Sequence, residues 1–297
     1  MLLAAIDIGT NAVRLFFSHV YEKGGRVCVE KTSLLRVPVR LGKDVFLKRV
    51  ISPVKIEKLI KTMQAYKLLM EVNEPVAYRA CATSAMREAK NGQEVIRQIR
   101  SETGIEVDMI NGMEEAAIIS SHQNFIIPGG CKFALFVDVG GGSTDLSLMR
   151  DGEVAAFGTF KIGTVRLLYQ KTSPAEWSKL EEWLLEHQTY FPETLFVGTG
   201  GNINKIAKLY SKSDTSHLSL TRLGHGLEDL EGFTVKERIE KLGLRPDRAD
   251  VITFAARIYS FIMQKAGVSN LFVPGTGLSD GIVHNLYREL KKNSPCV

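Results

Sequence analysis

A run of glycine and hydroxyl residues near the middle of the chain has the composition of a phosphate-binding turn. Residues 133–150 read FALFVDVGGGSTDLSLMR, where an apolar run reaches Asp138 and an apolar alternation resumes after the glycines. This pattern predicts a strand, a tight turn and a second strand. Glycines allow close approach and can direct backbone N–H groups at an anion, and hydroxyls add donors. The predicted phosphate-binding residues are Gly140, Gly141, Gly142, Ser143 and Thr144.

The alternative is a glycine-rich hairpin turn that binds nothing, because such turns are common between antiparallel strands. Asp138 ends the first predicted strand, where its carboxylate can hold Mg²⁺ against a bound phosphate. The four cysteines and six histidines are scattered without the spacing of a zinc site or a disulfide framework. Any metal is therefore expected to be a hard cation with oxygen ligands, Mg²⁺ or another divalent cation such as Mn²⁺.

A second copy of the pattern opens the chain. Residues 2–17 read LLAAIDIGTNAVRLFF, in which an apolar strand carries Asp7 and leads into the turn residues Gly9, Thr10 and Asn11. Residues 6–9 (IDIG) align with residues 137–140 (VDVG), so the chain is predicted to be internally duplicated. Two turns of this kind can face each other across a cleft.

A third glycine loop follows a predicted buried strand at 194–197 and precedes a predicted helix at 203–210. Its residues are Gly198, Thr199, Gly200, Gly201 and Asn202. A strand, a glycine loop and a helix in this order present free N–H groups to an anion or a nucleotide phosphate. Ordinary close packing is an equal alternative for this loop.

The pair Glu114-Glu115 stands in the first turn of a predicted helix and has two interpretations. Acidic residues there interact favourably with the helix macrodipole. The functional interpretation is that one carboxylate orients a water for attack on phosphorus, as a general base does. The helix lies just before Pro128-Gly129-Gly130, a predicted interdomain crossover, which favours the functional interpretation.

The length of 297 residues suits two domains. We expect them at 1–126 and 127–297, with a C-terminal helix at about 280–297 that can pack back onto the first domain. No apolar run approaches the roughly 18 residues of a membrane span, and the N-terminus has no signal-peptide pattern, so a cytoplasmic protein is expected.

Each half is predicted to begin with three strands, at 2–7, 13–20 and 26–36 in the first and at 133–138, 145–149 and 153–160 in the second. Helices are predicted from Ser52-Pro53, at 93–103, from Met113 to about Phe125, from a capping box at Ser173–Glu176, at 227–242 and through a long stretch ending at Lys265. Hairpin strands followed by alternating strands and helices are typical of an α/β fold with mixed sheets.

The net charge of +5 is unevenly spread. Residues 36–61 hold eight basic side chains against Asp44 and Glu57, a local charge of +6. This suits an anionic partner, although such a run is more often a solvated surface. No nucleic-acid-binding signature accompanies it, and neither nucleic acid nor membrane is expected as a partner. A homodimer stays open.

Seven motifs together resemble the exopolyphosphatase and guanosine pentaphosphate phosphohydrolase family, within the actin-like ATPase superfamily. They are DIGTN at 7–11 with Arg14, ATSAMREAKNG at 82–92, NGMEEA at 111–116, DVGGGSTD at 138–145, GTGGNI at 198–203, RADVI at 248–252 and GLSDGI at 277–282. The resemblance implies two ribonuclease-H-like (actin-like) domains with an active site in the interdomain cleft. The chain resembles the short form, which lacks an extra C-terminal helical domain.

The resemblance also implies roles for particular residues. Phosphate loops fall on residues 9–11, with Arg14 in the same motif, and on residues 140–144. Arg87 matches the basic phosphate ligand and Glu115 the catalytic base. The expected metal ligands are Asp138, Asp7 and Asp145. Two departures are evident, because Ala12 replaces a usual serine and Asp145 a usual glutamate, which affects substrate affinity and metal preference.

Three functions are compatible with these residues. The first is a phosphoanhydride hydrolase that acts on inorganic polyphosphate, guanosine pentaphosphate or both, favoured by NGMEEA and the basic segment. The second is an actin-like ATPase or sugar kinase, which shares the glycine loops. The third is a non-catalytic polyphosphate or alarmone sensor, which the departures at Ala12 and Asp145 keep open.

Overall fold

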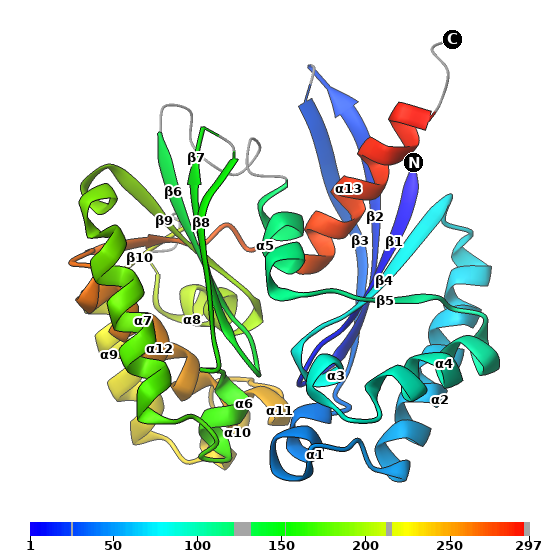
Figure 1. Cartoon of the computed structure of the whole chain (residues 1–297), viewed down its shortest axis with the longest axis horizontal. Helices are drawn as coiled ribbons and strands as arrows, with labels where there is room; N and C mark the ends of the chain where they lie inside the picture. The colour runs from blue at the N-terminus through cyan, green and yellow to red at the C-terminus, as the bar shows by residue number, and fades with distance from the viewer. Residues whose placement is uncertain (25, 122–131, 152, 212–215, 294–297) are drawn as a thin grey trace. The chain divides into compact units, whose positions relative to one another are not determined.

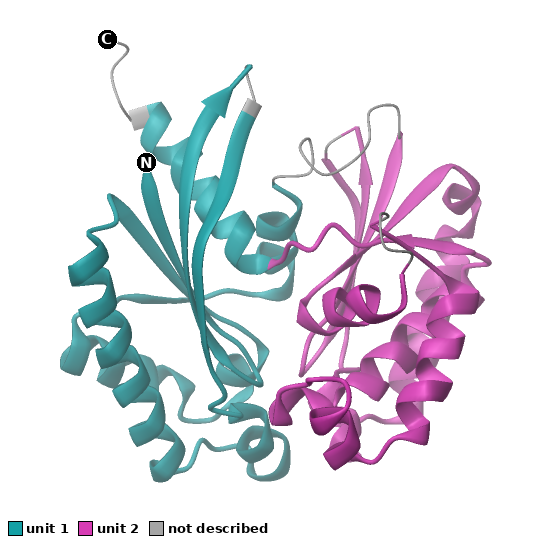
Figure 2. Cartoon of the chain, turned by 180° about the vertical axis from the view of Figure 1, so that it is seen from behind, with its two compact units in different colours: residues 1–125, 278–297 teal, residues 126–277 magenta. Residues whose placement is uncertain are grey.

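The computed structural model describes residues 1–24, 26–121, 132–151, 153–211 and 216–293. Two compact units divide the chain, one of residues 1–125 and 278–297 and the other of residues 126–277 (Figures 1 and 2). The crossover expected at Pro128-Gly129-Gly130 lies outside the described residues.

The first unit is built on a mixed sheet with the strand order β3-β2-β1-β4-β5. β1, β2 and β3 are antiparallel, whereas β4 and β5 run parallel to β1. The elements are β1 (Leu2–Ile8), β2 (Val13–Lys23), β3 (Arg26–Val37), α1 (Leu41–Lys48), α2 (Pro53–Asn73), β4 (Ala77–Ala82), α3 (Ser84–Glu88), α4 (Gly92–Thr103), β5 (Val107–Met109), α5 (Gly112–Ser120) and α13 (Leu278–Asn293). α2 and α4 lie on one side of this sheet, and α5 and α13 on the other (Figure 1).

The second unit repeats this order and adds one edge strand, giving β8-β7-β6-β9-β11-β10. Its elements are β6 (Phe133–Val139), β7 (Thr144–Arg150), β8 (Glu153–Phe160), α6 (Thr164–Leu168), α7 (Pro174–His187), the 3₁₀ helix η2 (Gln188–Glu193), β9 (Thr194–Thr199), α8 (Gly201–Tyr210), β10 (His217–Ser219), α9 (Leu220–Gly232), α10 (Val235–Glu240), α11 (Pro246–Ala249), α12 (Ile252–Lys265) and β11 (Asn270–Phe272). β9 is parallel to β6, as β4 is to β1.

The repeated strand order confirms the predicted α/β class and the ribonuclease-H-like, actin-like arrangement of each unit. Even the hairpin registers correspond, since Asp7 lies opposite Arg14 and Asp138 lies opposite Asp145. In both units a short helix follows the third strand and a longer helix begins at a Ser-Pro pair. The duplication predicted from the sequence is thus a duplication of structure.

The last helix, α13, belongs to the first unit, although its sequence follows the second. It packs against β1, β4 and α5. A Cβ on Gly281 would lie 2.1 Å from the carbonyl oxygen of Ile118, so only glycine allows this approach to α5. Ion pairs from Lys31 to Asp280 and from Lys291 to Glu22 tie α13 to the strands.

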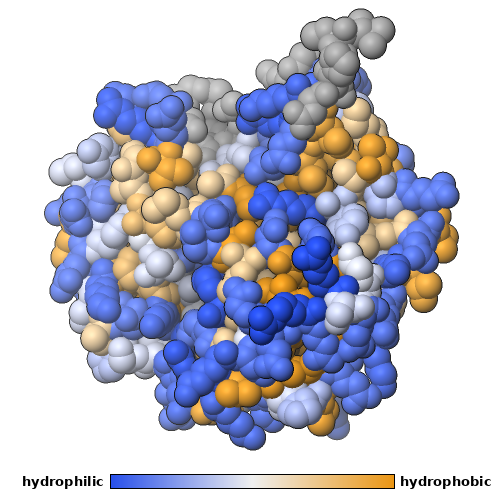
Figure 3. Space-filling view, turned by 45° about the vertical axis from the view of Figure 1, so that its right-hand side comes forward, coloured by the Kyte–Doolittle hydropathy of each residue, from blue (hydrophilic) through white to orange (hydrophobic). Residues whose placement is uncertain are grey.

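The core of the second unit joins its sheet to α7, α9 and α12, which gather on one side of it in Figure 1. The apolar side chains Val251, Ala255, Ile258 and Ile262, at and after the start of α12, are buried, whereas Phe254 is only half-buried. On the face shown in Figure 3, hydrophilic residues are interspersed with the apolar ones. None of the described helices has both the length and the apolar character needed to span a membrane.

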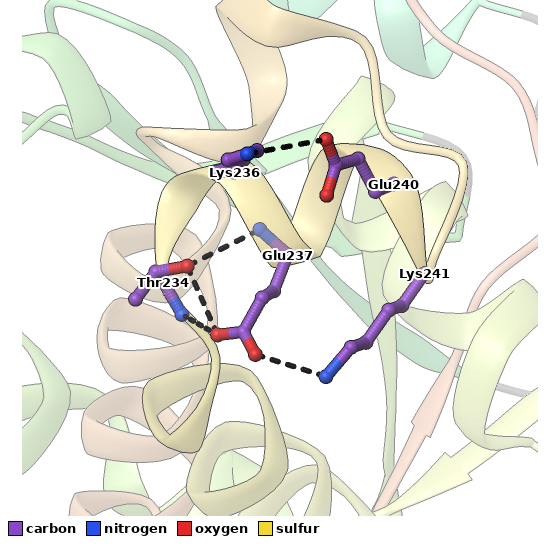
Figure 4. A network of polar contacts seen from close by, with 5 residues as sticks. All are labelled: Thr234, Lys236, Glu237, Glu240 and Lys241. Atoms are coloured by element: carbon purple, nitrogen blue, oxygen red, sulfur yellow. Dashed lines mark hydrogen bonds and ion pairs between the residues drawn. The ribbon is translucent and has the colours of Figure 1, made fainter.

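The single helix predicted at 227–242 is wrong, because α9 ends at Gly232 and α10 begins at Val235. A capping box causes the break. The Thr234 hydroxyl accepts from the Glu237 N–H at 3.2 Å, and the Glu237 carboxylate accepts from the Thr234 N–H at 2.9 Å (Figure 4). Lys241 also donates to that carboxylate, and the pKa of Glu237 falls to about 2, mainly through this hydrogen bond.

Other expectations also needed correction. The capping box predicted at Ser173–Glu176 is wrong, because Ser173 makes no capping bond and Glu176 instead accepts from the Lys161 N–H at 2.8 Å. The predicted stretch ending at Lys265 is two helices, α11 and α12, and the helix starting near Met113 is described as far as Ser120. α1, α6 and β10 were not predicted, since each is short and lacks a clear apolar period.

Candidate phosphate-binding and catalytic site

The turn after β1 is stabilised by a hydrogen bond within its own backbone and by hydrogen bonds from a neighbouring segment. The Gly9 N–H donates to the carbonyl oxygen of Ala12 at 3.1 Å. The N–H groups of Arg40 and Gly42, just before and within α1, donate to the carbonyl oxygens of Asn11 and Thr10, both at 2.9 Å. The turn is therefore fixed by α1, an element that was not predicted from the sequence.

A side-chain contact joins this turn to the ATSAMREAKNG motif. The hydroxyls of Thr10 and Ser84 are hydrogen-bonded at 2.8 Å, and both residues are buried. Ser84 lies in a motif noted in the sequence, where it was a candidate helix cap, but sequence reasoning did not assign it to the site. The contact explains why two stretches more than seventy residues apart belong to one site.

Asp7 is 3% exposed and is ion-paired with the guanidinium of Arg14 across the hairpin. The pair joins a predicted metal ligand to a residue of the phosphate-binding motif. A buried carboxylate with an arginine partner is already charge-compensated. Asp7 therefore differs from Asp138, whose partner across the equivalent hairpin is a second aspartate.

Arg87 and the pair Glu114-Glu115 are brought to one end of the first unit's sheet. The Arg87 guanidinium donates to the carbonyl oxygen of Ile110 at 2.5 Å, immediately before α5. Asn111 and Glu114 form a capping box, with hydrogen bonds of 2.9 and 2.7 Å. Glu114 thus stabilises the helix start, and the half-buried Glu115 stays the candidate base.

Cys81 lies close enough to Glu115 and Asp7 for their charges to act on its thiol. The pKa of the Cys81 thiol is raised to about 12, mainly by burial, and the carboxylates of Asp108, Asp7 and Glu115 contribute to the rise. Cys81 lies beside Asp7 in the β1–β4 register. The first unit therefore places its turn, Arg87 and Glu115 around the ends of β1, β4 and β5.

The turn after β6 repeats the closure of the first one. The Gly140 N–H donates to the carbonyl oxygen of Ser143 at 2.9 Å, as Gly9 does to Ala12. The Ser143 hydroxyl donates to Asp145 at 3.2 Å. The Thr144 hydroxyl is buried and donates to the carbonyl oxygen of Ile162 at 2.6 Å, so it serves the fold.

The third glycine loop packs against Asp138. The Thr199 hydroxyl donates to the Asp138 carboxylate at 3.1 Å. Gly200 has φ +101, and a Cβ there would lie 2.9 Å from the same carboxylate. Both the backbone conformation and the close approach therefore require glycine at this position. The structure therefore brings the loop predicted for a nucleotide or anion to the carboxylate predicted for a metal.

The oxygen donors at Asp138 fit a magnesium ion. Asp138 and Asp145 are opposite residues in an antiparallel pair, which places their Cβ atoms about 5 Å apart. Mg²⁺ is commonly held by one or two carboxylates, with water and phosphate completing its shell. Across the residues that the structure describes there is no cluster of three or more His, Cys, Asp or Glu that would form a cage of protein ligands.

A profile of the Ppx/GppA phosphatase family matches residues 22–291. The chain belongs to the Ppx/GppA phosphatase family. It is 28% identical to exopolyphosphatase 2 of Mycobacterium tuberculosis over 96% of this chain and 98% of the relative. It is 22% identical to the guanosine-5'-triphosphate,3'-diphosphate pyrophosphatase of Photobacterium profundum over 98% of this chain and 60% of that protein.

A solved exopolyphosphatase structure has the same fold. The crystal structure of an exopolyphosphatase from Cytophaga hutchinsonii aligns with a TM-score of 0.82 at 21% identity, covering 97% of this chain and 98% of that one. The two proteins therefore share the fold described above.

Part of the basic segment of this family member makes contacts within its own fold. The ammonium groups of Lys55 and Lys58 donate to the carbonyl oxygens of Val39 and Pro38, at 2.5 and 2.9 Å. Burial lowers the pKa of Lys55, and neighbouring cations lower it further. Lys61 pairs with Glu57 within α2. These contacts favour the structural interpretation for this part of the segment.

Tyr259 contacts the strand that leads into the second turn. Its fully buried hydroxyl lies 2.9 Å from the carbonyl oxygen of Val137 and 2.7 Å from that of Thr199, so it ties β6 to β9 beside Asp138. Burial raises its pKa well above the ordinary value. No sequence signal marked Tyr259, since it lies on the apolar face of a helix.

We expect Tyr259→Phe to lower the free energy of unfolding by about 1–3 kcal/mol, because two buried carbonyl groups lose their shared donor. Urea unfolding followed by circular dichroism measures the change. Tyr78→Phe, at an exposed position, is the control and should unfold like the wild type. An unchanged unfolding midpoint for Tyr259→Phe would show that its hydroxyl adds no stability.

Proposed function

We propose that the protein is a phosphoanhydride hydrolase that releases terminal phosphate from inorganic polyphosphate, guanosine pentaphosphate or both. The observation that carries the proposal is the same closed glycine turn, with an aspartate at the preceding strand, in both units of a Ppx/GppA family member. The names of two relatives, exopolyphosphatase and guanosine-5'-triphosphate,3'-diphosphate pyrophosphatase, support this substrate class.

Phosphoryl transfer to water passes through a transition state whose charge is spread over the equatorial oxygens. Such a reaction needs positioned donors and an aligned water more than covalent chemistry. In our proposal the amides of the two turns bind phosphoryl oxygens of the substrate, and Arg87 neutralises their charge. Glu115 orients the attacking water and accepts its proton.

Asp138 and Asp145 are the residues that would hold Mg²⁺, which when bound would neutralise charge on the phosphoryl oxygens. Asp7 was expected beside them as a third ligand. Its ion pair with Arg14 supports a different role, in which Asp7 holds the guanidinium at the first turn. Arg14 then supplies a positioned cation to the phosphate.

Release of orthophosphate from three substrates, each with and without Mg²⁺, tests the proposal against its alternatives. We expect Mg²⁺-dependent release from polyphosphate, guanosine pentaphosphate or both, and little from ATP. Binding without release would favour a sensor. Turnover of ATP, or transfer of its phosphate to a sugar, would favour an ATPase or a kinase. No release from either of the first two substrates would overturn the proposal.

A further inference from the structure

The turn at Gly140–Ser143 is held by a segment to which neither the resemblance nor the mechanism above gives a role. The N–H groups of Thr164 and Val165, at the start of α6, donate to the carbonyl oxygens of Gly140 and Gly141 at 3.0 and 2.9 Å. The next carbonyl, of Gly142, accepts from the Arg166 side chain, whose Nε lies 2.6 Å away. All three glycine carbonyls are thus directed at one element.

This arrangement fixes the direction of the amides in the turn. In a planar trans peptide the N–H points away from the C=O, and the described residues contain no cis peptide bond. With the three carbonyls bonded to α6, the amides of Gly141, Gly142 and Ser143 point to the opposite side. The amides of Gly141 and Gly142 find no acceptor among the residues that the structure describes. Consecutive inward amides of this kind form an anion-binding nest.

Arg166 differs from the other groups that hold the turn because it is charged and buried, with 5% of its surface exposed. A guanidinium donates a stronger hydrogen bond than a neutral group does. Its bond to Gly142 polarises the Gly142–Ser143 peptide and makes the Ser143 amide a better donor to an anion. In the first turn the corresponding support comes from the backbone amides of Arg40 and Gly42.

We propose that Arg166 is a positioning residue, which orients and polarises the second turn so that its amides bind a phosphoryl group of a phosphoanhydride. The inference rests on the proposed function for its substrate class. It assigns Arg166 no contact with the substrate, because its effect passes through the Gly142 carbonyl.

The second unit offers a matched control for a purely structural role. Arg238 is also buried, with 9% of its surface exposed, and donates to the carbonyl oxygens of Leu230 and Ala249 at 2.7 and 2.9 Å. These bonds join α9, α10 and α11 rather than the glycine turn. Removing either arginine should destabilise the fold, but only Arg166 should affect anion binding.

The test compares Arg166→Met, Arg166→Lys and Arg238→Met for tripolyphosphate binding by titration calorimetry and for unfolding by urea. We expect Arg166→Met to weaken tripolyphosphate binding about 10- to 100-fold, the range of one charge-assisted hydrogen bond, and Arg166→Lys to weaken it less. Arg238→Met should bind like the wild type at temperatures where it is folded. If the wild type hydrolyses the substrate, Arg166→Met should also raise KM.

Wild-type affinity in folded Arg166→Met, an equal loss in Arg238→Met, or no tripolyphosphate binding by the wild type would each overturn the inference. These outcomes are separable from failure of the proposed function. A wild type that binds tripolyphosphate without hydrolysing polyphosphate or guanosine pentaphosphate would refute the hydrolase and leave the role of Arg166 testable by binding. If the wild type hydrolyses these substrates and Arg166→Met is unaffected, the role of Arg166 is refuted and the hydrolase proposal stands.

Discussion

Glu115→Gln is expected to release orthophosphate from polyphosphate about 10²- to 10⁴-fold more slowly than the wild type, the usual effect of losing a general base. The substitution keeps the size of the side chain and removes its charge and its capacity to accept a proton. Tripolyphosphate should still bind, because the turns and Arg87 are unchanged. Initial rates at saturating substrate, together with calorimetric affinity, measure the two effects separately.

The neighbouring residue supplies the control. Glu114 is exposed, and its carboxylate caps the start of α5 through the Asn111 N–H at 2.7 Å. Glutamine can replace glutamate in a capping box, so Glu114→Gln should keep both the helix and the rate. Equal losses of rate in the two variants would indicate that negative charge at the start of α5, rather than a base at Glu115, supports the reaction. A Glu115→Gln protein with the wild-type rate would remove Glu115 from catalysis.

Asp138→Asn is expected to lower kcat by about 10²- to 10³-fold at a fixed Mg²⁺ concentration, the range for losing one transition-state-stabilising group. Asparagine keeps an oxygen that can accept from Thr199, so the contact between β6 and the third glycine loop is preserved. Mn²⁺ binding measured by electron paramagnetic resonance should weaken in parallel, and excess Mg²⁺ should restore part of the rate.

Asp229→Asn is the control for the second unit. Asp229 is exposed and accepts from the Tyr210 hydroxyl at 2.5 Å, with no bond to the glycine turns. Its substitution should leave kcat and Mn²⁺ binding unchanged. If Asp138→Asn behaves in the same way, the cation does not depend on Asp138 and the metal assignment fails.

The turns were predictable because their signal is local. An apolar strand, an aspartate and a glycine turn specify a hairpin wherever they occur, and the two copies confirmed each other. What the sequence did not show was the partner of each aspartate. Arg14 and Asp145 occupy equivalent positions opposite Asp7 and Asp138, yet Arg14 forms an ion pair with Asp7, whereas Asp145 places a second carboxyl group opposite Asp138.

Contacts between residues that lie far apart in the sequence could not be predicted from local sequence patterns. Ser84 reaches Thr10, and Tyr259 reaches Val137, only after the sheet has assembled. The break between α9 and α10 was different, since the Thr234–Glu237 capping box was visible in the sequence. The apolar spacing of residues 227–242 continues through the break and therefore predicts a single helix.

The most direct test of the central claim is hydrolysis of long-chain polyphosphate by the wild type with Mg²⁺ in ¹⁸O-enriched water, followed by ³¹P nuclear magnetic resonance. We predict orthophosphate carrying solvent oxygen, released while the remaining chains shorten from their ends. If polyphosphate is not hydrolysed, the same experiment is carried out with guanosine pentaphosphate. Absence of labelled orthophosphate from both substrates would contradict the account.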